Sequence, residues 1–387
     1  MPTDAGTLQD GQYIKPLPSA YSAGQIIQWL SRIGFPRSYS DAEISGGAFP
    51  HTLDHLEVLT RLHLIAFPFE NTEMHYTAHH TIDVSLQGAF ERMVINHKGS
   101  YCFGQNGLFM NMLRGLGYRA YAGSARVNMT PEDVKNPPKF TATSHMVVFV
   151  QPYKGSNETY LVDVGFGSTG LVRPILLSDR EGNTVMGTTA MEKHRLRRGV
   201  HPSSSLGRDF YLPPQTLILD IYFCPDVAGA LTSRADYLWT LELCHTRSDG
   251  TPLPWRLLYT FAENECFPID AENASLVIST KPEGIFWHNL LCIKYEFLDN
   301  VDPSDEEARA QAEAERRQVT EGVKSTLMFK YVMFGREVRR NIGSSSVMIR
   351  TLGSDLERIR ALKEVFGLDL PEDARVHVKG RAPSLDG

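Results

Sequence analysis

The sequence predicts an α+β protein, with helices in its first third and antiparallel strands after them. Two observations support this prediction. Residues 20–118 carry apolar side chains at helical spacing, whereas after Gly117 the apolar runs become short, β-branched and aromatic, with turn residues between them. The chain has 387 residues, of which 42% are hydrophobic and 22% charged. It is therefore expected to be a globular protein of about two or three domains.

Four helices are expected before residue 118. The first two are predicted in AGQIIQWLSRIGF and HTLDHLEVLTRLHLIAF, where leucine and isoleucine recur at helical spacing, and Pro68 ends the second. The third lies in SLQGAFERMVIN. The fourth begins near Tyr101, runs through GQNGLFMNMLRGLG and stops at Gly115 and Gly117.

Strands are expected next, in YRAYAGSARV, SHMVVFVQPY and ETYLVDVGF, and a later hairpin turns at residues 249–250. Residues 178–215 are polar and rich in glycine, serine and arginine, which predicts a mobile excursion with a few strand turns. The charged, alanine-rich stretch at 304–327 is interpreted as a solvated helix or a disordered insertion. SDLERIRALKEVFGLDL predicts an amphipathic helix capped by Ser354 and ended by Gly367, with a frayed tail after it.

Charge and cysteine content exclude several classes of protein. The 39 basic and 45 acidic side chains give a net charge of −6, which argues against nucleic acid or an anionic membrane as a general partner, although a local basic patch is compatible with it. The first residues have no apolar segment typical of a secretory signal, and no run of about 18 apolar residues predicts a membrane span. Five cysteines without a C-x-x-C pair predict neither a disulfide framework nor a zinc site. We therefore expect a cytoplasmic protein with free thiols and no metal.

One cysteine stands out as a candidate nucleophile. Catalysis by a thiol requires a cysteine held as a thiolate, an imidazole that takes its proton and a group that orients the imidazole. Cys102 in KGSYCFGQNGLF opens a predicted helix, where free backbone N–H groups and the helix dipole stabilise a thiolate. The remaining cysteines lie in apolar or strand-like surroundings, and we interpret them as small buried side chains: Cys224, Cys244, Cys266 and Cys292.

His145 and Asp163 are candidate partners of this thiol. His145 begins the predicted strand SHMVVFV, and Asp163 lies within the apolar run YLVDVGFG. An ionised carboxylate inside an apolar strand is costly unless it is paired, so Asp163 needs a partner. His145 is the natural candidate, because a separation of 18 residues fits two adjacent antiparallel strands joined by a loop. Spacing alone leaves a catalytic triad and separate structural roles both open.

Four stretches of the sequence, taken in order, resemble the arylamine N-acetyltransferases. HLIAFPFEN is similar to the family's H-L-x-x-P-F-E-N, and KGSYCFGQNGLF to its R-G-G-x-C-F-E-x-N-G-L-F motif. SHMVVFV is similar to a family strand that opens with histidine, and YLVDVGFG to the V-D-x-G-F-G motif. The ending VFGLDL also resembles that of the family, so the resemblance covers about residues 25–370.

The resemblance implies a fold with a cysteine-protease-like core. In this fold, residues 1–117 would form a helical bundle that carries the nucleophile, and residues 118–235 an antiparallel β-barrel that carries the histidine and the aspartate. Residues 236–387 would form an α/β lid with the charged insertion and the C-terminal helix.

The resemblance also implies ping-pong transfer of an acyl group from acyl-coenzyme A to an arylamine or a hydrazine, as in xenobiotic metabolism. Cys102 would form the thioester, His145 would take and return the proton, and Asp163 would hold the imidazole tautomer. Backbone N–H groups near Cys102 would meet the oxyanion. Acetyl-coenzyme A is the common donor in the family and some fungal members prefer malonyl-coenzyme A, so the acyl group stays open.

Three positions depart from the family motif. Lys98 stands in place of an arginine, so a bidentate pair there, such as one with Glu70, would be altered. Ser100 replaces a glycine. Gly104 replaces the glutamate beside the nucleophile, where a small residue would leave room for a larger or charged acyl chain. None of the three removes a member of the triad.

Further residues match substrate-contacting positions of the family. Phe69 in PFEN and Phe166 in DVGFG match positions that line the acceptor site, and Val127 is their expected neighbour. Ordinary core packing is an equally good interpretation of all three. Thr141 and Ala142, shortly before the histidine, match a stretch that contacts coenzyme A.

Two other functions fit the same residues. A cysteine hydrolase or transglutaminase-like enzyme would use the same triad without coenzyme A. A catalytically silent binding protein would be compatible with the departures at Lys98 and Gly104. The sequence predicts neither the natural amine nor the oligomeric state.

Overall fold

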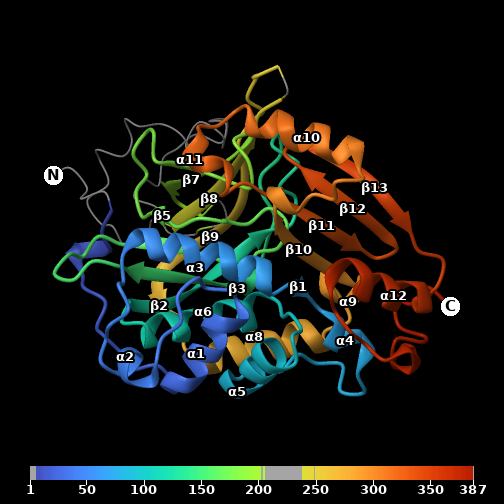
Figure 1. Cartoon of the computed structure of the whole chain (residues 1–387), viewed down its shortest axis with the longest axis horizontal. Coiled ribbons are helices and arrows are strands. Elements are labelled where there is room, and N and C mark those ends of the chain that lie inside the picture. Colours follow the sequence, from blue (N-terminus) through green and yellow to red (C-terminus); the bar gives the residue numbers. More distant parts are fainter. Residues whose placement is uncertain (1–5, 202–203, 205–237, 248, 387) are drawn as a thin grey trace.

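The computed structural model describes residues 6–201, 204, 238–247 and 249–386. Figure 1 shows most of the blue and teal N-terminal helices at the lower left and most of the orange and red C-terminal elements at the upper right. The strands form two antiparallel sheets. The predicted α+β fold is therefore confirmed.

Helices dominate the chain before the first long strand. Ser22 and Ser40 begin two of these helices through capping boxes with Gln25 and Glu43. The third predicted helix divides into a short α-helix and a π-helical turn. The elements are η1 (Gln9–Gly11), α1 (Ala23–Arg32), α2 (Asp41–Ser45), α3 (Leu53–Ala66), α4 (Thr72–Tyr76), α5 (Leu86–Phe90), η2 (Glu91–Ile95) and α6 (Cys102–Gly115).

The larger sheet has eight strands in the order β5-β4-β3-β2-β9-β8-β7-β6 and is nearly closed into a barrel. The sequence predicted that His145 begins a strand. β3 begins at Phe140 instead, so His145 lies inside this strand. The strands are β2 (Arg119–Asn128), β3 (Phe140–Gln151), β4 (Tyr160–Val162), β5 (Ile175–Leu176), β6 (Thr184–Met186), β7 (Glu192–Gly199), β8 (Leu238–His245) and β9 (Arg256–Glu265).

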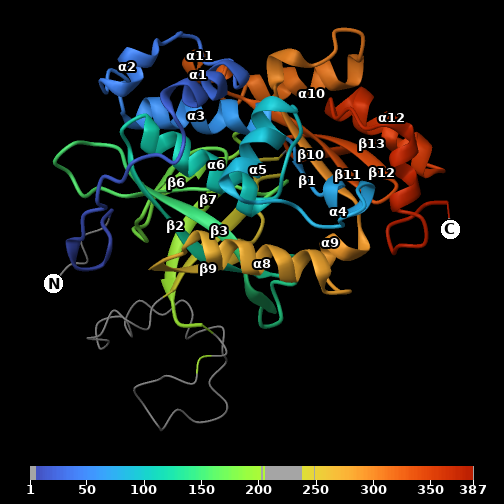
Figure 2. The same ribbon diagram turned by 90° about the horizontal axis from the view of Figure 1, so that it is seen from below.

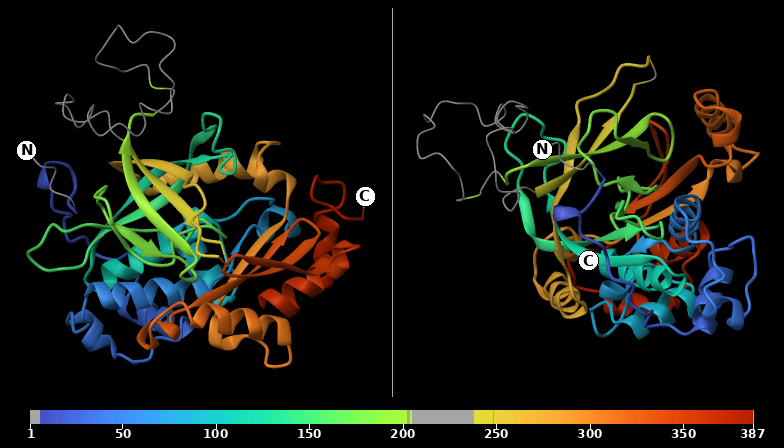
Figure 3. Two further views of the ribbon diagram at one scale, coloured as in Figure 1. Left: turned by 90° about the horizontal axis from the view of Figure 1, so that it is seen from above. Right: turned by 90° about the vertical axis from the view of Figure 1, so that its left-hand side faces the viewer.

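The smaller sheet joins the two ends of the chain. Its order is β1-β10-β11-β12-β13, so the short N-terminal strand β1 (Phe69–Glu70) pairs with a strand more than 200 residues later. Figure 3 shows this sheet beside the larger one, and Figure 2 shows α8 running beneath the larger sheet. The C-terminal elements are α8 (Pro268–Thr280), α9 (Ile285–His288), β10 (Leu291–Phe297), η5 (Leu298–Asn300), α10 (Glu306–Arg316), α11 (Glu321–Lys324), β11 (Met328–Phe334), β12 (Glu337–Ile342), β13 (Ser345–Thr351), α12 (Asp355–Phe366) and η6 (Glu372–His377).

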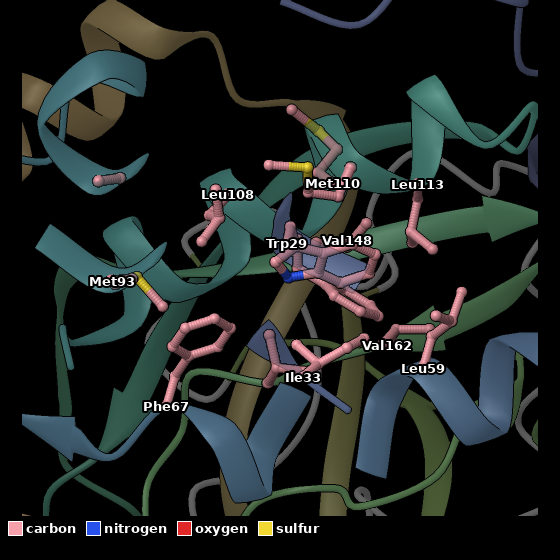
Figure 4. Close-up of a cluster of buried hydrophobic side chains, with 14 of the residues drawn as sticks. Trp29, Ile33, Leu59, Phe67, Met93, Leu108, Met110, Leu113, Val148 and Val162 are labelled. Carbon is pink, nitrogen blue, oxygen red and sulfur yellow. The ribbon is translucent and has the colours of Figure 1, made fainter. Parts of the chain in front are cut away.

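The main hydrophobic core lies between the N-terminal helices and one face of the larger sheet (Figure 4). Trp29 of α1 is fully buried there, with Leu59 of α3 and Leu113 of α6. Val148 of β3 and Val162 of β4 close the same core from the sheet. Burial of these side chains fixes α6, and with it Cys102, against β3 and β4.

Several peripheral segments are more ordered than the sequence suggested. Within 178–215, the structure builds β6 and β7, and residues 202–203 and 205–215 of this range lie outside the described residues. In the charged insertion, Ala308 and Ala312 of α10 are buried against the smaller sheet. The tail is not frayed, because the Ser384 hydroxyl and the Leu385 N–H each donate to Asp355 Oδ2 at 3.0 Å.

The three-part division at residues 117 and 235 stays a prediction. β8 and β9 follow residue 235 and still belong to the eight-stranded sheet, while β1 precedes residue 117 and belongs to the five-stranded one. Among the residues that the structure describes, no helix combines the length and the apolar character needed to cross a bilayer.

Candidate active site

Cys102 is the first residue of α6 and is 3% exposed. The preceding Tyr101 is extended, and its side chain does not cap the helix, so the first backbone N–H groups of α6 have no side-chain cap. The thiol Sγ lies 3.7 Å from the carbonyl oxygen of Ser144 on β3. A thiolate at this position is stabilised by the positive end of the helix dipole.

His145 and Asp163 form a buried pair next to this thiol. His145 Nε2 lies 2.7 Å from Asp163 Oδ2, and the two residues are 3% and 1% exposed. Burial by itself lowers the pKa of His145, but the charge and hydrogen bond of Asp163 and the contact with Cys102 raise it to about 10. Burial likewise opposes ionisation of Asp163, and the pairing with His145 outweighs it and lowers the Asp163 pKa. Because Asp163 takes Nε2, Nδ1 is the nitrogen left to exchange a proton with Cys102.

Asn106, one turn after Cys102 on α6, fixes the position of Asp163. Its Nδ2 donates to Asp163 Oδ1 at 2.9 Å and to the Met146 carbonyl at 2.7 Å, and its Oδ1 accepts from Val164 N at 3.0 Å. Asn106 was not predicted as a site residue. The signal was its i+4 spacing from Cys102, which places both on one face of the helix.

Gly165 allows the loop after Asp163 to approach α6. A Cβ atom at this position would lie 2.7 Å from Cys102 Cα and 3.0 Å from the Cys102 carbonyl oxygen. Gly165 N also donates to Asp163 Oδ1 at 2.9 Å. A glycine between Asp163 and Phe166 is therefore required for the carboxylate to reach His145.

Aromatic rings surround the imidazole. The Phe166 ring lies edge-on to His145 with its centroid 5.1 Å away, and Tyr259 of β9 lies 5.1 Å from His145 and 4.9 Å from Phe166. Tyr259 is fully buried, and burial together with the neighbouring Asp163 raises its pKa well above the usual value. Tyr259 could not be predicted from the sequence, because it lies 114 residues from His145 and meets it through the pairing of strands in the sheet.

The predicted substrate residues fall into two groups. Phe69 borders Gly167, because a Cβ at Gly167 would contact its ring at 3.4 Å, and this places Phe69 beside the loop that carries Phe166. Val127 and Thr141 lie together at a bulge between β2 and β3, where Val127 N donates to Thr141 Oγ1 at 3.0 Å. The neighbouring Ala142 is exposed. Val127 is the register partner of Tyr259 on β9, whose ring centroid lies 4.9 Å from that of Phe166, so strand pairing connects the second group to the first.

The sequence predicts that a bidentate pair with Glu70 is altered at Lys98, and in the described residues Glu70 forms no ion pair with Lys98. Glu70 is fully buried and pairs instead with Arg92 of η2, whose Nη2 lies 2.5 Å from Glu70 Oε1. Arg92 also donates through Nε to the carbonyl of Gly99, just before the α6 start, at 2.6 Å. An arginine six residues earlier in the chain thus supplies the planar fork that Lys98 lacks.

The remaining cysteines that the structure describes are buried, and burial raises the pKa of each: Cys244, Cys266 and Cys292. Cys224 lies outside the described residues. Within residues 6–201, 204, 238–247 and 249–386, no group of three or more histidine, cysteine or acidic side chains is arranged to hold a metal ion.

Comparison with known proteins identifies the family. Residues 52–297 match the sequence model of an N-acetyltransferase family. The chain is 28% identical over 369 residues to the N-malonyltransferase FDB2 of Fusarium pseudograminearum, covering 92% of each protein. It is also 34% identical over 142 residues to the arylamine N-acetyltransferase of Escherichia coli, which covers 36% of this chain and 47% of that protein.

Solved structures share the fold over nearly the whole chain. The arylamine N-acetyltransferase of Nocardia farcinica superposes with a TM-score of 0.62 at 20% identity, covering 95% of this chain and 99% of that one. The Mycobacterium marinum arylamine N-acetyltransferase in complex with CoA gives a TM-score of 0.58 at 21% identity, covering 92% and 98%. Since the family match spans more than half of the chain, this protein belongs to the arylamine N-acetyltransferase family.

Proposed function

We propose that this protein is an acyl-coenzyme A-dependent N-acyltransferase that moves an acetyl or malonyl group to an arylamine or hydrazine through a thioester on Cys102. The observation that carries the proposal is the buried chain of contacts from Cys102 at the helix start to His145 and Asp163. Family membership supports the acyl transfer to an amine.

In the first half-reaction, the Cys102 thiolate attacks the carbonyl carbon of the acyl-coenzyme A thioester. The oxyanion that develops is met by backbone N–H groups at the start of α6. When the bond to the coenzyme A sulfur breaks, protonated His145 gives its proton to that sulfur. Free coenzyme A leaves, and the acyl group remains on Sγ of Cys102.

In the second half-reaction, the amine nitrogen attacks the Cys102 thioester. Neutral His145 takes the proton that the nitrogen loses, the C–S bond breaks, and the thiolate–imidazolium pair is restored together with the amide product. Throughout, Asp163 holds the ring in one orientation and stabilises its charged form. Phe69 and Phe166 would contact the aromatic acceptor, while Val127, Thr141 and Ala142 would lie along the coenzyme A chain.

The choice of acyl donor is supported by the relatives rather than by one residue. The Fusarium pseudograminearum N-malonyltransferase aligns with 92% of this chain, whereas the Escherichia coli arylamine N-acetyltransferase aligns with 36%. We therefore propose malonyl-coenzyme A as the preferred donor and acetyl-coenzyme A as a slower one. We also propose that the enzyme is cytoplasmic, since the described cysteines are free thiols, and that it acts in xenobiotic metabolism, as the resemblance to the family implies.

Intact mass after mixing with each donor and no amine tests the function. Wild-type protein should gain one malonyl or acetyl group, Cys102→Ala should gain none, and an added aniline should discharge the adduct. Protein that stays unmodified with every donor would overturn the proposal. Turnover of a simple ester or amide without coenzyme A would favour a hydrolase or transglutaminase-like enzyme, and a Cys102 that alkylates no faster than free cysteine would favour a silent binding protein.

A further inference from the structure

The loop that follows Asp163 is attached to two different parts of the chain. Asn106 of α6 binds its first residues, through the bonds to Asp163 and Val164. Two side chains of the five-stranded sheet bind its later carbonyl oxygens. Phe166, whose ring lies against His145, sits between these two attachments.

The second attachment consists of buried donors on neighbouring strands. Tyr295 of β10 is 2% exposed, and its hydroxyl donates to the carbonyl oxygen of Gly167 at 2.6 Å. The ammonium group of Lys330 on β11 is also buried and donates to the carbonyl oxygen of Ser168. Two consecutive carbonyl groups are thus held by the C-terminal sheet, immediately after the aromatic residue.

Burial of Lys330 requires that its charge be balanced. Glu192 of β7, which is 2% exposed, provides the balance, with Oε2 3.4 Å from Lys330 Nζ. Glu192 also accepts from Thr188 N at 3.2 Å and lies 3.2 Å from His245 Nε2. A buried ion pair is seldom better for stability than apolar packing. Its presence at this loop therefore indicates that Lys330 serves to hold the loop backbone in place.

The backbone at this point also needs an external support. Gly167 has a φ of +88°, in the left-handed region, and has no side chain of its own to pack. Tyr295 fixes its carbonyl directly, and the ring of Phe69 borders the same residue. Loss of the Tyr295 bond would let residues 166–168 move while Asn106 still held Asp163.

We propose that Tyr295 and Lys330 are positioning residues for the amine, which fix the backbone at Gly167 and Ser168 and thereby the ring of Phe166. Asn106 in turn positions the carboxylate that serves thioester formation. The five-stranded sheet then governs amine binding without taking part in the first half-reaction. This inference rests on the proposed function, in which Phe166 contacts the acceptor.

Tyr295→Phe is the cleanest test, because it removes one hydroxyl and keeps the ring. Tyr118→Phe is a matched control, because Tyr118 is 1% exposed and its hydroxyl also donates to a backbone carbonyl. That carbonyl belongs to Thr52 in the N-terminal helical region, at 2.8 Å. For each variant we measure the rate constant of Cys102 acylation by malonyl- and acetyl-coenzyme A and the KM of aniline. The Kd of aniline is measured after each substitution is combined with Cys102→Ala, which prevents turnover.

Tyr295→Phe should raise both the KM and the Kd of aniline by about three- to ten-fold, the effect of one lost hydrogen bond. It should leave the acylation rate constant and its pH profile unchanged, and Tyr118→Phe should change none of these quantities. Lys330→Met combined with Glu192→Gln removes both charges together and should reproduce the Tyr295→Phe pattern.

An unchanged aniline KM and Kd in Tyr295→Phe would overturn the inference, as would a fall in acylation rate equal to the fall in kcat/KM for aniline. These outcomes differ from failure of the proposed function, in which wild-type protein itself forms no thioester. In that case the Kd of aniline still decides whether Tyr295 positions the ring. If the double variant does not fold, the Tyr295→Phe result decides alone.

Discussion

The side chain of Ser100 fills the space that a Cβ atom on Gly104 would need. A Cβ at Gly104 would lie 2.2 Å from Ser100 Oγ and 2.8 Å from Ser100 Cβ. Ser100 is fully buried. The two departures from the family motif therefore compensate each other, and whether Gly104 admits a larger acyl chain stays a prediction.

Gly104→Ala should lower the free energy of unfolding by about 1–3 kcal/mol, because the added methyl group overpacks the site. Adding Ser100→Gly to this variant should restore most of the loss by removing the clash. Gly107→Ala on the same helix is the control, since a Cβ there meets no atom within 4 Å and should stabilise the protein by up to about 1 kcal/mol. Urea unfolding of the single and double variants gives the coupling. Equal losses in Gly104→Ala and the double variant would contradict the shared space.

Arg92→Met should destabilise the fold far more than Lys98→Met. Arg92 is the partner of the fully buried Glu70, and loss of one member of such a pair costs about 3–5 kcal/mol. Lys98 forms no ion pair among the described residues, so its replacement should change the free energy of unfolding by less than about 0.5 kcal/mol. Glu70→Gln added to Arg92→Met should recover part of the loss. Denaturant unfolding measures all three, and similar losses for Arg92→Met and Lys98→Met would show that the lysine does carry the pair.

The contact between His145 and Asp163 could be predicted from the sequence because it follows from local features of the chain. A charge inside an apolar strand requires a partner, and 18 residues fit one antiparallel turn. The structure shows this contact at 2.7 Å, while the catalytic roles stay predictions. The α+β class was predictable for a similar reason, since helix and strand periodicities are local.

Contacts that depend on sheet register could not be predicted. Tyr295 reaches Gly167 across 128 residues, and its place follows from the pairing of β10 with β1 and β11. The Arg92 pair was missed because η2 turns this side chain toward Glu70, and no spacing rule joins positions 22 residues apart across a loop. The tail was predicted as frayed because a polar ending gives no sign of a buried carboxylate such as Asp355 that binds it.

Asn106→Leu should impair both stability and thioester formation. The substitution keeps the volume but leaves Val164 N without its acceptor. It also removes one donor from the Met146 carbonyl and one from Asp163 Oδ1, which still accepts from Gly165 N, so we expect a loss of about 2–4 kcal/mol. Acylation of Cys102 should slow because the bond by which α6 helps to hold the carboxylate toward His145 is lost. Asn111→Ala, about one and a half turns further along α6, is the control for acylation, because the Asn111 side chain bonds the Gly107 carbonyl and Ala20 N rather than a member of the triad. Normal acylation in folded Asn106→Leu would contradict this role.

Asp163→Asn should slow alkylation of Cys102 below neutral pH. The charge of Asp163 is the main influence that overcomes burial and raises the pKa of His145 to about 10, so the neighbouring imidazole stays protonated and favours the thiolate. The His145 pKa in the folded protein lies above the unfolded value near 6.5. The contribution of the His145–Asp163 pair to the free energy of unfolding is therefore complete below about pH 6.5 and is lost as the pH rises toward about 10. Wild-type Cys102 should therefore react with iodoacetamide at about pH 6 at least ten-fold faster than free cysteine, and Asp163→Asn should lose most of that advantage.

Glu242→Gln, which removes a buried carboxylate paired with Arg195, should keep the wild-type alkylation profile. Mass spectrometry of the Cys102 peptide measures each rate, and identical profiles for Asp163→Asn and wild type would show that another group keeps His145 charged.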